Sequence, residues 1–192
     1  SIFGVNQFSS NIPVLFISLC SILLIYKLGN LLFNEKVGLL AAFLLSLFPL
    51  DVVYSTRLLT DIPSAFFAAL CVYFFLKSEK MKKSSKSNFY YFISGVSIGI
   101  AYLIKELSLL IILFFVLYSI YKKRIKKEYV FMALGFLFVF SIELVYLFKI
   151  TGNPLFRFSA ISSEWVDVSM KNNFWGTGAF PFSILHHFYV MF

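Results

Sequence analysis

The strongest constraint on this chain is a long apolar stretch, residues 89–121, enclosed by two lysine-rich runs at residues 77–86 and 122–127. The only charged residues inside the stretch are Lys105 and Glu106. As one helix it would be about 50 Å long, whereas the hydrocarbon core of a bilayer is about 30 Å thick. Lysine-rich flanks favour the cytoplasmic side of a membrane. We therefore expect two short helices that fold back, with Lys105 and Glu106 at the external tip.

The composition is that of a polytopic membrane protein. Hydrophobic residues make up 60% of the 192 residues and charged residues 14%, and the mean hydropathy is +0.86. A soluble domain of this size could not hide so much apolar surface from water. The net charge of +8 is concentrated in the two lysine-rich runs, so it indicates orientation in a membrane and not nucleic-acid binding.

The hydropathy pattern predicts an all-α bundle of about six transmembrane helices in a single transmembrane domain. The expected spans are residues 12–33, 37–54, 62–76, 89–104, 107–121 and 129–148. Residues 149–183 are expected to form an external loop, and residues 184–192 to begin a further span. Pro49 should kink the second span, and Thr60 or Asp61 should cap the third. Gly95 and Gly99 hint at close helix packing.

The distribution of basic residues predicts the topology. Under this assignment twelve lysines and arginines fall on the cytoplasmic side and five on the external side. The external five are Arg57, Lys105, Lys149, Arg157 and Lys171. We expect an integral, multi-pass protein of the plasma membrane or an endomembrane, with its functional face outside or in the lumen.

The chain begins at Ser1 without a methionine, and we expect it to be a fragment of a longer protein whose N-terminal part is missing. Cys20 and Cys71 lie inside apolar spans, where they are interpreted as small packing residues and not as a disulfide or a metal site. His186 and His187 are adjacent, so on a helix their side chains would point about 100° apart and would seldom bind one metal ion together.

The external charges are the candidates for chemistry, because ionisable residues near a membrane are costly. Arg57 and Lys105 could bind an anionic group such as a phosphate. Asp61 or Glu106 could then bind sugar hydroxyls or a metal, or assist a proton transfer. Arg57 and Asp61 are four residues apart and could also pair with each other. Alternatively, Lys105 and Glu106 only mark a polar hairpin tip, and Arg57 only extends to the interface.

Two acidic residues inside spans need separate interpretation. Glu143 lies within the sixth expected span, where it could pair with a lysine of a neighbouring helix, Lys105 being one candidate. A structural pair and a substrate contact are equally compatible with that position. Asp51 follows Pro49 by two residues and could be a local hydrogen-bonding group. From the residues alone, three classes stay open: an enzyme acting on a lipid phosphate, a transporter or lipid flippase, and a non-catalytic membrane scaffold.

Several segments together resemble a known family. They are residues 3–8, 32–49 and 55–61, the segment 94–106 that ends in Lys105-Glu106, and residues 151–156, which read Thr-Gly-Asn-Pro-Leu-Phe. Their order is similar to that in integral-membrane glycosyltransferases of the GT-C class. The nearest groups are the dolichyl-phosphate-mannose protein mannosyltransferases and the aminoarabinose transferases of lipid A.

The resemblance implies a helical membrane fold and an inverting sugar transfer. The donor would be a polyprenyl-phosphate sugar, and the acceptor a protein, lipid or glycan on the external or lumenal side. The family's main base is an acid in the first external loop, which we expect upstream of Ser1. Asp61 matches the acid of the family's Thr-Asp motif as an accessory catalytic residue. Lys105 matches the family's lysine, followed here by Glu106 where a glycine is common. No cofactor is implied with certainty, and the class has members with and without a divalent metal.

Overall fold

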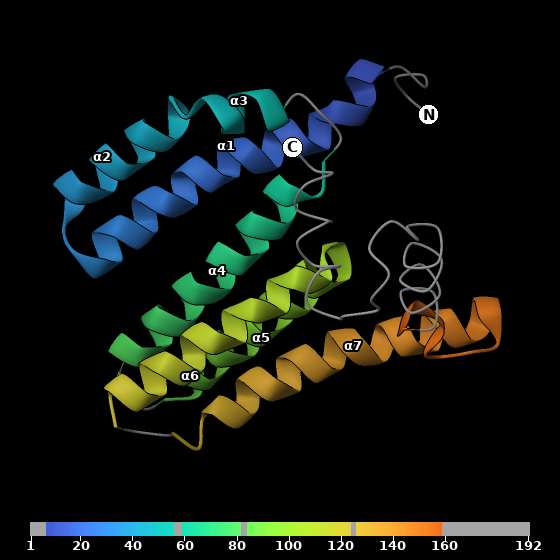
Figure 1. Ribbon diagram of the computed structural model, residues 1–192. Helices are drawn as coiled ribbons and strands as arrows, with labels where there is room; N and C mark the ends of the chain where they lie inside the picture. The colour runs from blue at the N-terminus through green and yellow to red at the C-terminus, as the bar shows by residue number, and fades with distance from the viewer. Residues whose placement is uncertain (1–6, 56–58, 82–83, 124–125, 159–192) are drawn as a thin grey trace, which may run out of the picture. The chain divides into compact units, whose positions relative to one another are not determined.

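The computed structural model describes residues 7–55, 59–81, 84–123 and 126–158 (Figure 1). The chain separates into two compact units, residues 1–141 and 142–192. The helices are α1 (Gln7–Leu32), α2 (Glu35–Ser46), α3 (Pro49–Ser55), α4 (Asp61–Lys80), α5 (Ser85–Ile104), the 3-10 helix η1 (Glu106–Leu110), α6 (Ile111–Tyr121) and α7 (Tyr129–Thr151).

Helix α1 packs antiparallel against α2 and α3, which follow each other with a bend between them. The side chain of Asn34 accepts a 2.9 Å hydrogen bond from the backbone N–H of Val37 and so caps α2. A Cβ atom on Gly29 would lie 2.7 Å from the Cα of Gly38, so the two backbones touch just beside this turn. Helices α2 and α3 meet at an angle of 60°, which confirms the kink expected at Pro49. The hydroxyl of Ser18 donates to the Asp51 carboxylate at 2.8 Å. Asp51 is thus a hydrogen-bonding group as expected, but its partner is not local: Ser18 is 33 residues away, on α1.

The core lies between α4, α5 and α6. Phe75 of α4 is completely buried, and its ring centroid lies 4.8 Å from that of Phe115 and 6.0 Å from that of Tyr91. Cys71 is also fully buried, and its sulfur lies 3.2 Å from the hydroxyl of Ser94. Cys71 is therefore a packing residue of the α4–α5 interface, as its apolar surroundings in the sequence suggested.

Glycines allow α5 and the first half of α7 to pack backbone against backbone. A Cβ on Gly95 would lie 1.9 Å from the carbonyl oxygen of Met132, and one on Gly135 would lie 2.2 Å from that of Phe92. A Cβ on Gly99 would likewise lie 2.8 Å from the Cβ of Val139. The Gly-x-x-x-Gly hint is thus confirmed: without a hydrophobic force between helices in lipid, such close packing holds neighbouring helices together.

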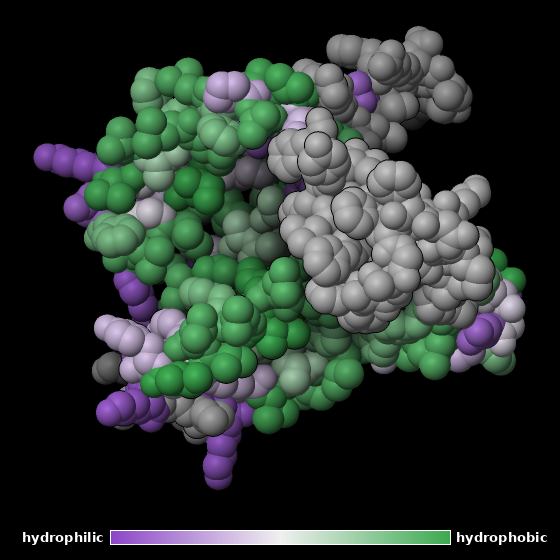
Figure 2. All heavy atoms as spheres, viewed as in Figure 1, coloured by the Kyte–Doolittle hydropathy of each residue, from purple (hydrophilic) through white to green (hydrophobic). Residues whose placement is uncertain are grey.

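The connections of the first unit gather at two ends of the α4–α5 hairpin (Figure 1). At one end, Lys80 donates to the carbonyl oxygen of Leu31, and Nζ of Lys126 lies 3.0 Å from Oε2 of Glu79. These two contacts bring the α1–α2 turn, the α4–α5 loop and the α6–α7 loop together. At the other end, α5 turns into η1 beside the start of α4. Figure 2 shows hydrophilic side chains projecting from the first end and hydrophobic side chains covering the flanks of these helices.

The helices have the dimensions of membrane spans. Within the described residues, four are long and apolar enough to cross a bilayer: 11–32 of α1, then α4, α5 and α7. The bent pair α2 and α3 makes a fifth if it counts as one span, and η1 with α6 forms a shorter apolar segment over Glu106–Tyr121. The protein is an all-α polytopic membrane protein, and the apolar stretch 89–121 folds back at Lys105 as the sequence predicts.

Candidate functional site

The candidate site lies at the corner where α5 ends and η1 begins. Lys105 has an extended backbone, with φ −152° and ψ 118°, between the helical residues on either side. Its N–H still donates to the carbonyl of Ala101 at 2.9 Å, and its own carbonyl accepts from the N–H of Ser108 at 3.0 Å. The chain therefore leaves the α5 axis at Lys105 alone, and the lysine is held at the turn by the backbone on both sides.

At this corner Lys105 meets the first residue of α4. Its Nζ lies 2.5 Å from Oδ1 of Asp61, with 29% of the lysine side chain and 44% of the aspartate side chain exposed. One turn further along α4, the Ser64 hydroxyl lies 2.6 Å from that of Ser108, which also donates to the Ala101 carbonyl at 3.2 Å. Both contacts join residues 44 apart in the chain. Two polar contacts thus fix the start of α4 against η1.

This geometry leaves the lysine able to bind an anion. An ammonium group has three N–H donors, of which the Asp61 carboxylate takes one. The aspartate orients the lysine by accepting that one hydrogen bond. Since the lysine side chain is partly exposed, a ligand arriving at this end of the helices can reach it.

The other residues predicted for this site are placed differently. Glu106 is the first residue of η1 and is exposed, next to but not within the Asp61–Lys105 pair. Arg57 lies outside the described residues. Thr60 and not Asp61 occupies the N-cap position of α4, and its side chain makes no capping hydrogen bond.

Lys105, the candidate partner that the sequence offered for Glu143, is not the partner observed. Oε1 of Glu143 lies 2.5 Å from Nη1 of Arg157, within the second unit. The Glu143 side chain is only 9% exposed and that of Arg157 is 21% exposed. Lys105 has Asp61 as its partner instead. The sequence placed Glu143 correctly inside a helix. Its partner, Arg157, follows the turn at Thr151 and Gly152 and lies beside it after the chain reverses.

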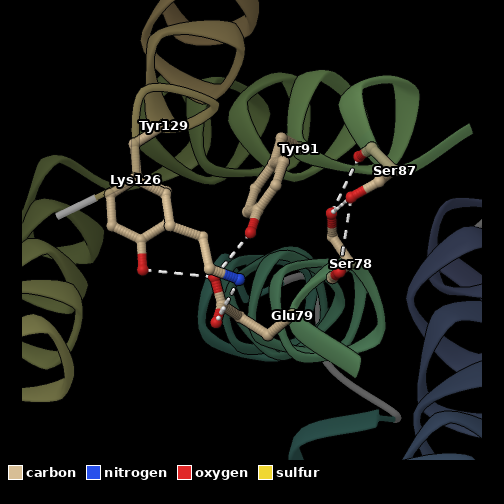
Figure 3. Close-up of polar contacts among 6 residues, drawn as sticks. All are labelled: Ser78, Glu79, Ser87, Tyr91, Lys126 and Tyr129. Carbon is tan, nitrogen blue, oxygen red and sulfur yellow. Dashed lines mark hydrogen bonds and ion pairs between the residues drawn. The ribbon is translucent and has the colours of Figure 1, made fainter. Parts of the chain in front are cut away.

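A second polar cluster was missed by sequence reasoning (Figure 3). Oε1 of Glu79 accepts hydrogen bonds from the hydroxyls of Tyr91 at 2.5 Å and Tyr129 at 3.2 Å, and Oε2 lies 3.0 Å from Nζ of Lys126. Glu79 is 11% exposed, and its partners come from α5, from α7 and from the loop between α6 and α7. Beside it, the Ser78 hydroxyl bonds both the hydroxyl and the carbonyl of Ser87 at 2.8 Å.

The signal for this cluster was present in the sequence. Glu79 is the only acid in the lysine-rich run 77–86, and no role of its own was predicted for it. It also lies four residues after Phe75 and therefore on the same helix face as that core residue. An acid on the buried face, at the end of an apolar span, indicates an internal partner.

Metal binding finds no support among the described side chains: no group of three or more histidines, cysteines, aspartates or glutamates could hold an ion there. His186, His187 and most of the expected external loop 149–183 lie outside the described residues.

The apolar helices, the fold-back at Lys105 and the charged corner define a multi-span membrane protein with a polar site at one end of its helices. The sequence profile of the dolichyl-phosphate-mannose-protein mannosyltransferase family matches residues 1–146, which is most of the chain. The protein belongs to this family and is a membrane glycosyltransferase of the GT-C type. No curated protein and no solved structure matches the chain.

Proposed function

We propose that the protein transfers a sugar from a polyprenyl-phosphate donor to an acceptor at the end of its helices opposite the lysine-rich loops. The observation that carries the proposal is the Asp61–Lys105 pair, a partly exposed cation held at the tip of an apolar hairpin. By the lysine and arginine distribution, this end faces the outside or the lumen. A mannosyl donor and a protein acceptor are the substrates that the family name supports.

Lys105 acts on the donor phosphate in this proposal. The polyprenyl tail stays in the lipid, and its phosphate lies at the level of the headgroups. As the bond between the anomeric carbon and the phosphate oxygen breaks, the leaving phosphate gains negative charge. A preorganised cation stabilises that charge most in the transition state. The two ammonium protons not directed at Asp61 are the donors available to the phosphate oxygens.

Asp61 positions Lys105 and is the accessory acidic residue of the site, beside the main base of the family. Arg57, four residues before it in the sequence, would add a second cation for the phosphate. Glu106 would contact the sugar. We assign removal of the acceptor proton to the acid of the first external loop of the family, and attack from the face opposite the phosphate then inverts the anomeric centre. We propose no metal in this step.

The experiment is sugar transfer by the full-length protein in proteoliposomes that contain polyprenyl-phosphate mannose and a serine- and threonine-rich acceptor peptide. We expect Lys105→Met to lower kcat by about 100-fold or more, as for other single groups that stabilise a developing charge. Lys86→Met, at an exposed lysine near the start of α5, is the matched control and should stay near the wild-type rate. Equal rates for Lys105→Met and the wild type would refute the role of the lysine, and digestion of the product with an anomer-specific mannosidase tests inversion.

A further inference from the structure

An apolar groove runs between α5, α6 and α7, away from the Asp61–Lys105 corner. Its volume is about 700 Å³, within the range of ligand-binding pockets. On α6 it is lined by Ile112, Val116 and Ile120, which are spaced four residues apart and so form one stripe along the helix. On α7, Met132, Ala133 and Phe136 line it. The stripe on α6 alone is about 12 Å long at the rise of an α-helix.

One end of the groove is polar and basic. Ser119, Lys123 and Tyr129 line it there, where α6 ends and α7 begins. Lys126 is close in sequence, but its charge is matched by Glu79 at 3.0 Å. Lys123 therefore gives this end of the groove its positive charge. An apolar trough that ends in a cation matches an amphiphile with an apolar chain and an anionic head.

The backbone of Lys123 is unusual. Its φ is +48°, and it is the only residue other than glycine with positive φ in the described part of the chain. Its N–H donates to the Ile120 carbonyl at 3.0 Å, so it closes the C-terminus of α6 in the left-handed conformation. Glycine is strongly preferred at such a position, because a side chain there is strained. A lysine that keeps this conformation and lines the groove indicates a role for its side chain.

We propose that the groove binds one acyl chain of an anionic phospholipid from the leaflet beside the lysine-rich loops, with the phosphate on Lys123. Basic pockets between transmembrane helices are suited to anionic headgroups. The site is separate from the donor site proposed above and does not depend on it: η1 and α6 lie between Lys105 and Lys123 and span about 26 Å together. A polyprenyl phosphate held at Lys105 therefore has its head at the other end of the hairpin.

The test is native mass spectrometry of the delipidated full-length protein, titrated with phosphatidylglycerol or with phosphatidylcholine of the same acyl chains. We expect tighter binding of phosphatidylglycerol. Lys123→Gly should weaken it about fivefold, the contribution of one lysine to an anionic lipid surface. This variant removes the cation while supplying the residue that the backbone favours, so the fold should be kept. Lys122→Ala, at the exposed neighbour that does not line the groove, is the matched control and should bind as the wild type does.

A second variant tests the groove itself. Ala133 lines it, and Ala133→Trp should fill the apolar space and abolish binding of both lipids. Phosphatidylglycerol binding should also persist in an excess of polyprenyl phosphate. Four results would each overturn the proposal: unchanged binding in Lys123→Gly, equal loss in Lys122→Ala, unchanged binding in Ala133→Trp, or displacement by polyprenyl phosphate. Absence of any bound lipid in the wild type, as when another helix of the full-length protein covers the groove, would overturn it too.

Discussion

Asp61 and Glu79 lie near the two ends of the same helix, and each pairs with a lysine from elsewhere in the chain. They are 18 residues apart on α4, or about 27 Å along its axis, which is close to the thickness of a hydrocarbon core. Asp61 pairs with Lys105 at the fold-back of the hairpin, and Glu79 pairs with Lys126 among the lysine-rich loops. The pairs differ in exposure: Asp61 is 44% exposed, whereas Glu79 is 11% exposed and also accepts two tyrosine hydroxyls. That difference supports a binding role for the first pair and a structural role for the second.

Exchanging the charges of the first pair separates folding from catalysis. The double variant Asp61→Lys with Lys105→Asp keeps an ion pair between α4 and the η1 corner but moves the cation to α4. Because exposed pairs contribute only about 0.2–1 kcal/mol, we expect a melting temperature near that of the wild type. Sugar transfer should nevertheless be lost, since the cation no longer sits at the Lys105 turn. The measurement is transfer rate and thermal unfolding of the full-length protein, and restored transfer in the double variant would show that the pair is only structural.

Much of the fold could be predicted because membrane burial leaves clear marks in a sequence. The stretch 89–121 is too long for one span and is flanked by lysines on both sides, so a fold-back at Lys105 was the simplest solution. The bend near Pro49 followed from the missing N–H of proline. The close packing of Gly95 on α7 was only hinted at, because glycine spacing does not identify the partner helix.

The site was less predictable, since pairing between distant residues depends on how the helices pack. The sequence identified Asp61 and Lys105 as charges for the same end, but it did not pair them with each other: it offered Arg57 as a possible partner of Asp61, and Lys105 as one candidate partner of Glu143. Arg57 lies outside the described residues, so its pairing stays a prediction. The structure joins Asp61 to Lys105 directly, and it gives Glu143 to Arg157. Glu79 was hidden by its lysine-rich neighbours, because local charge cannot show which face of a helix is buried.

The Glu79 cluster should be a major contributor to stability. Replacing Glu79 by leucine leaves two tyrosine hydroxyls and Lys126 without their acceptor. Removing one partner of a buried pair costs about 3–5 kcal/mol, so we expect a large drop in the melting temperature. Glu79→Gln keeps an oxygen acceptor for the tyrosines and should cost less, about 1–3 kcal/mol. Thermal unfolding in detergent measures both, with Glu35→Gln at an exposed helix start as control. Equal stability of Glu79→Leu and the control would contradict the structural role.

Gly95 should not tolerate any side chain. A Cβ there would lie 1.9 Å from the Met132 carbonyl oxygen, so Gly95→Ala must push α5 and α7 apart. Overpacking of this kind typically costs about 1–3 kcal/mol. Ser141→Ala, at an exposed position of α7, serves as the control and should unfold at the wild-type temperature. Thermal unfolding in detergent measures both variants, and an unchanged melting temperature in Gly95→Ala would refute the predicted close approach.

In the second unit, we expect Glu143 and Arg157 to be coupled energetically in the stability of the folded protein. Arg157→Met leaves the Glu143 carboxylate, 9% exposed, without that partner inside an apolar helix. Breaking such a pair from one side typically costs about 3–5 kcal/mol, because a buried charge loses its compensation. Adding Glu143→Gln removes that charge, so the double variant should be more stable than Arg157→Met alone. We expect a coupling energy of about 0.5–3 kcal/mol from the double-mutant cycle, measured by thermal unfolding of the full-length protein. Strictly additive effects would mean that the two side chains do not interact in the folded protein.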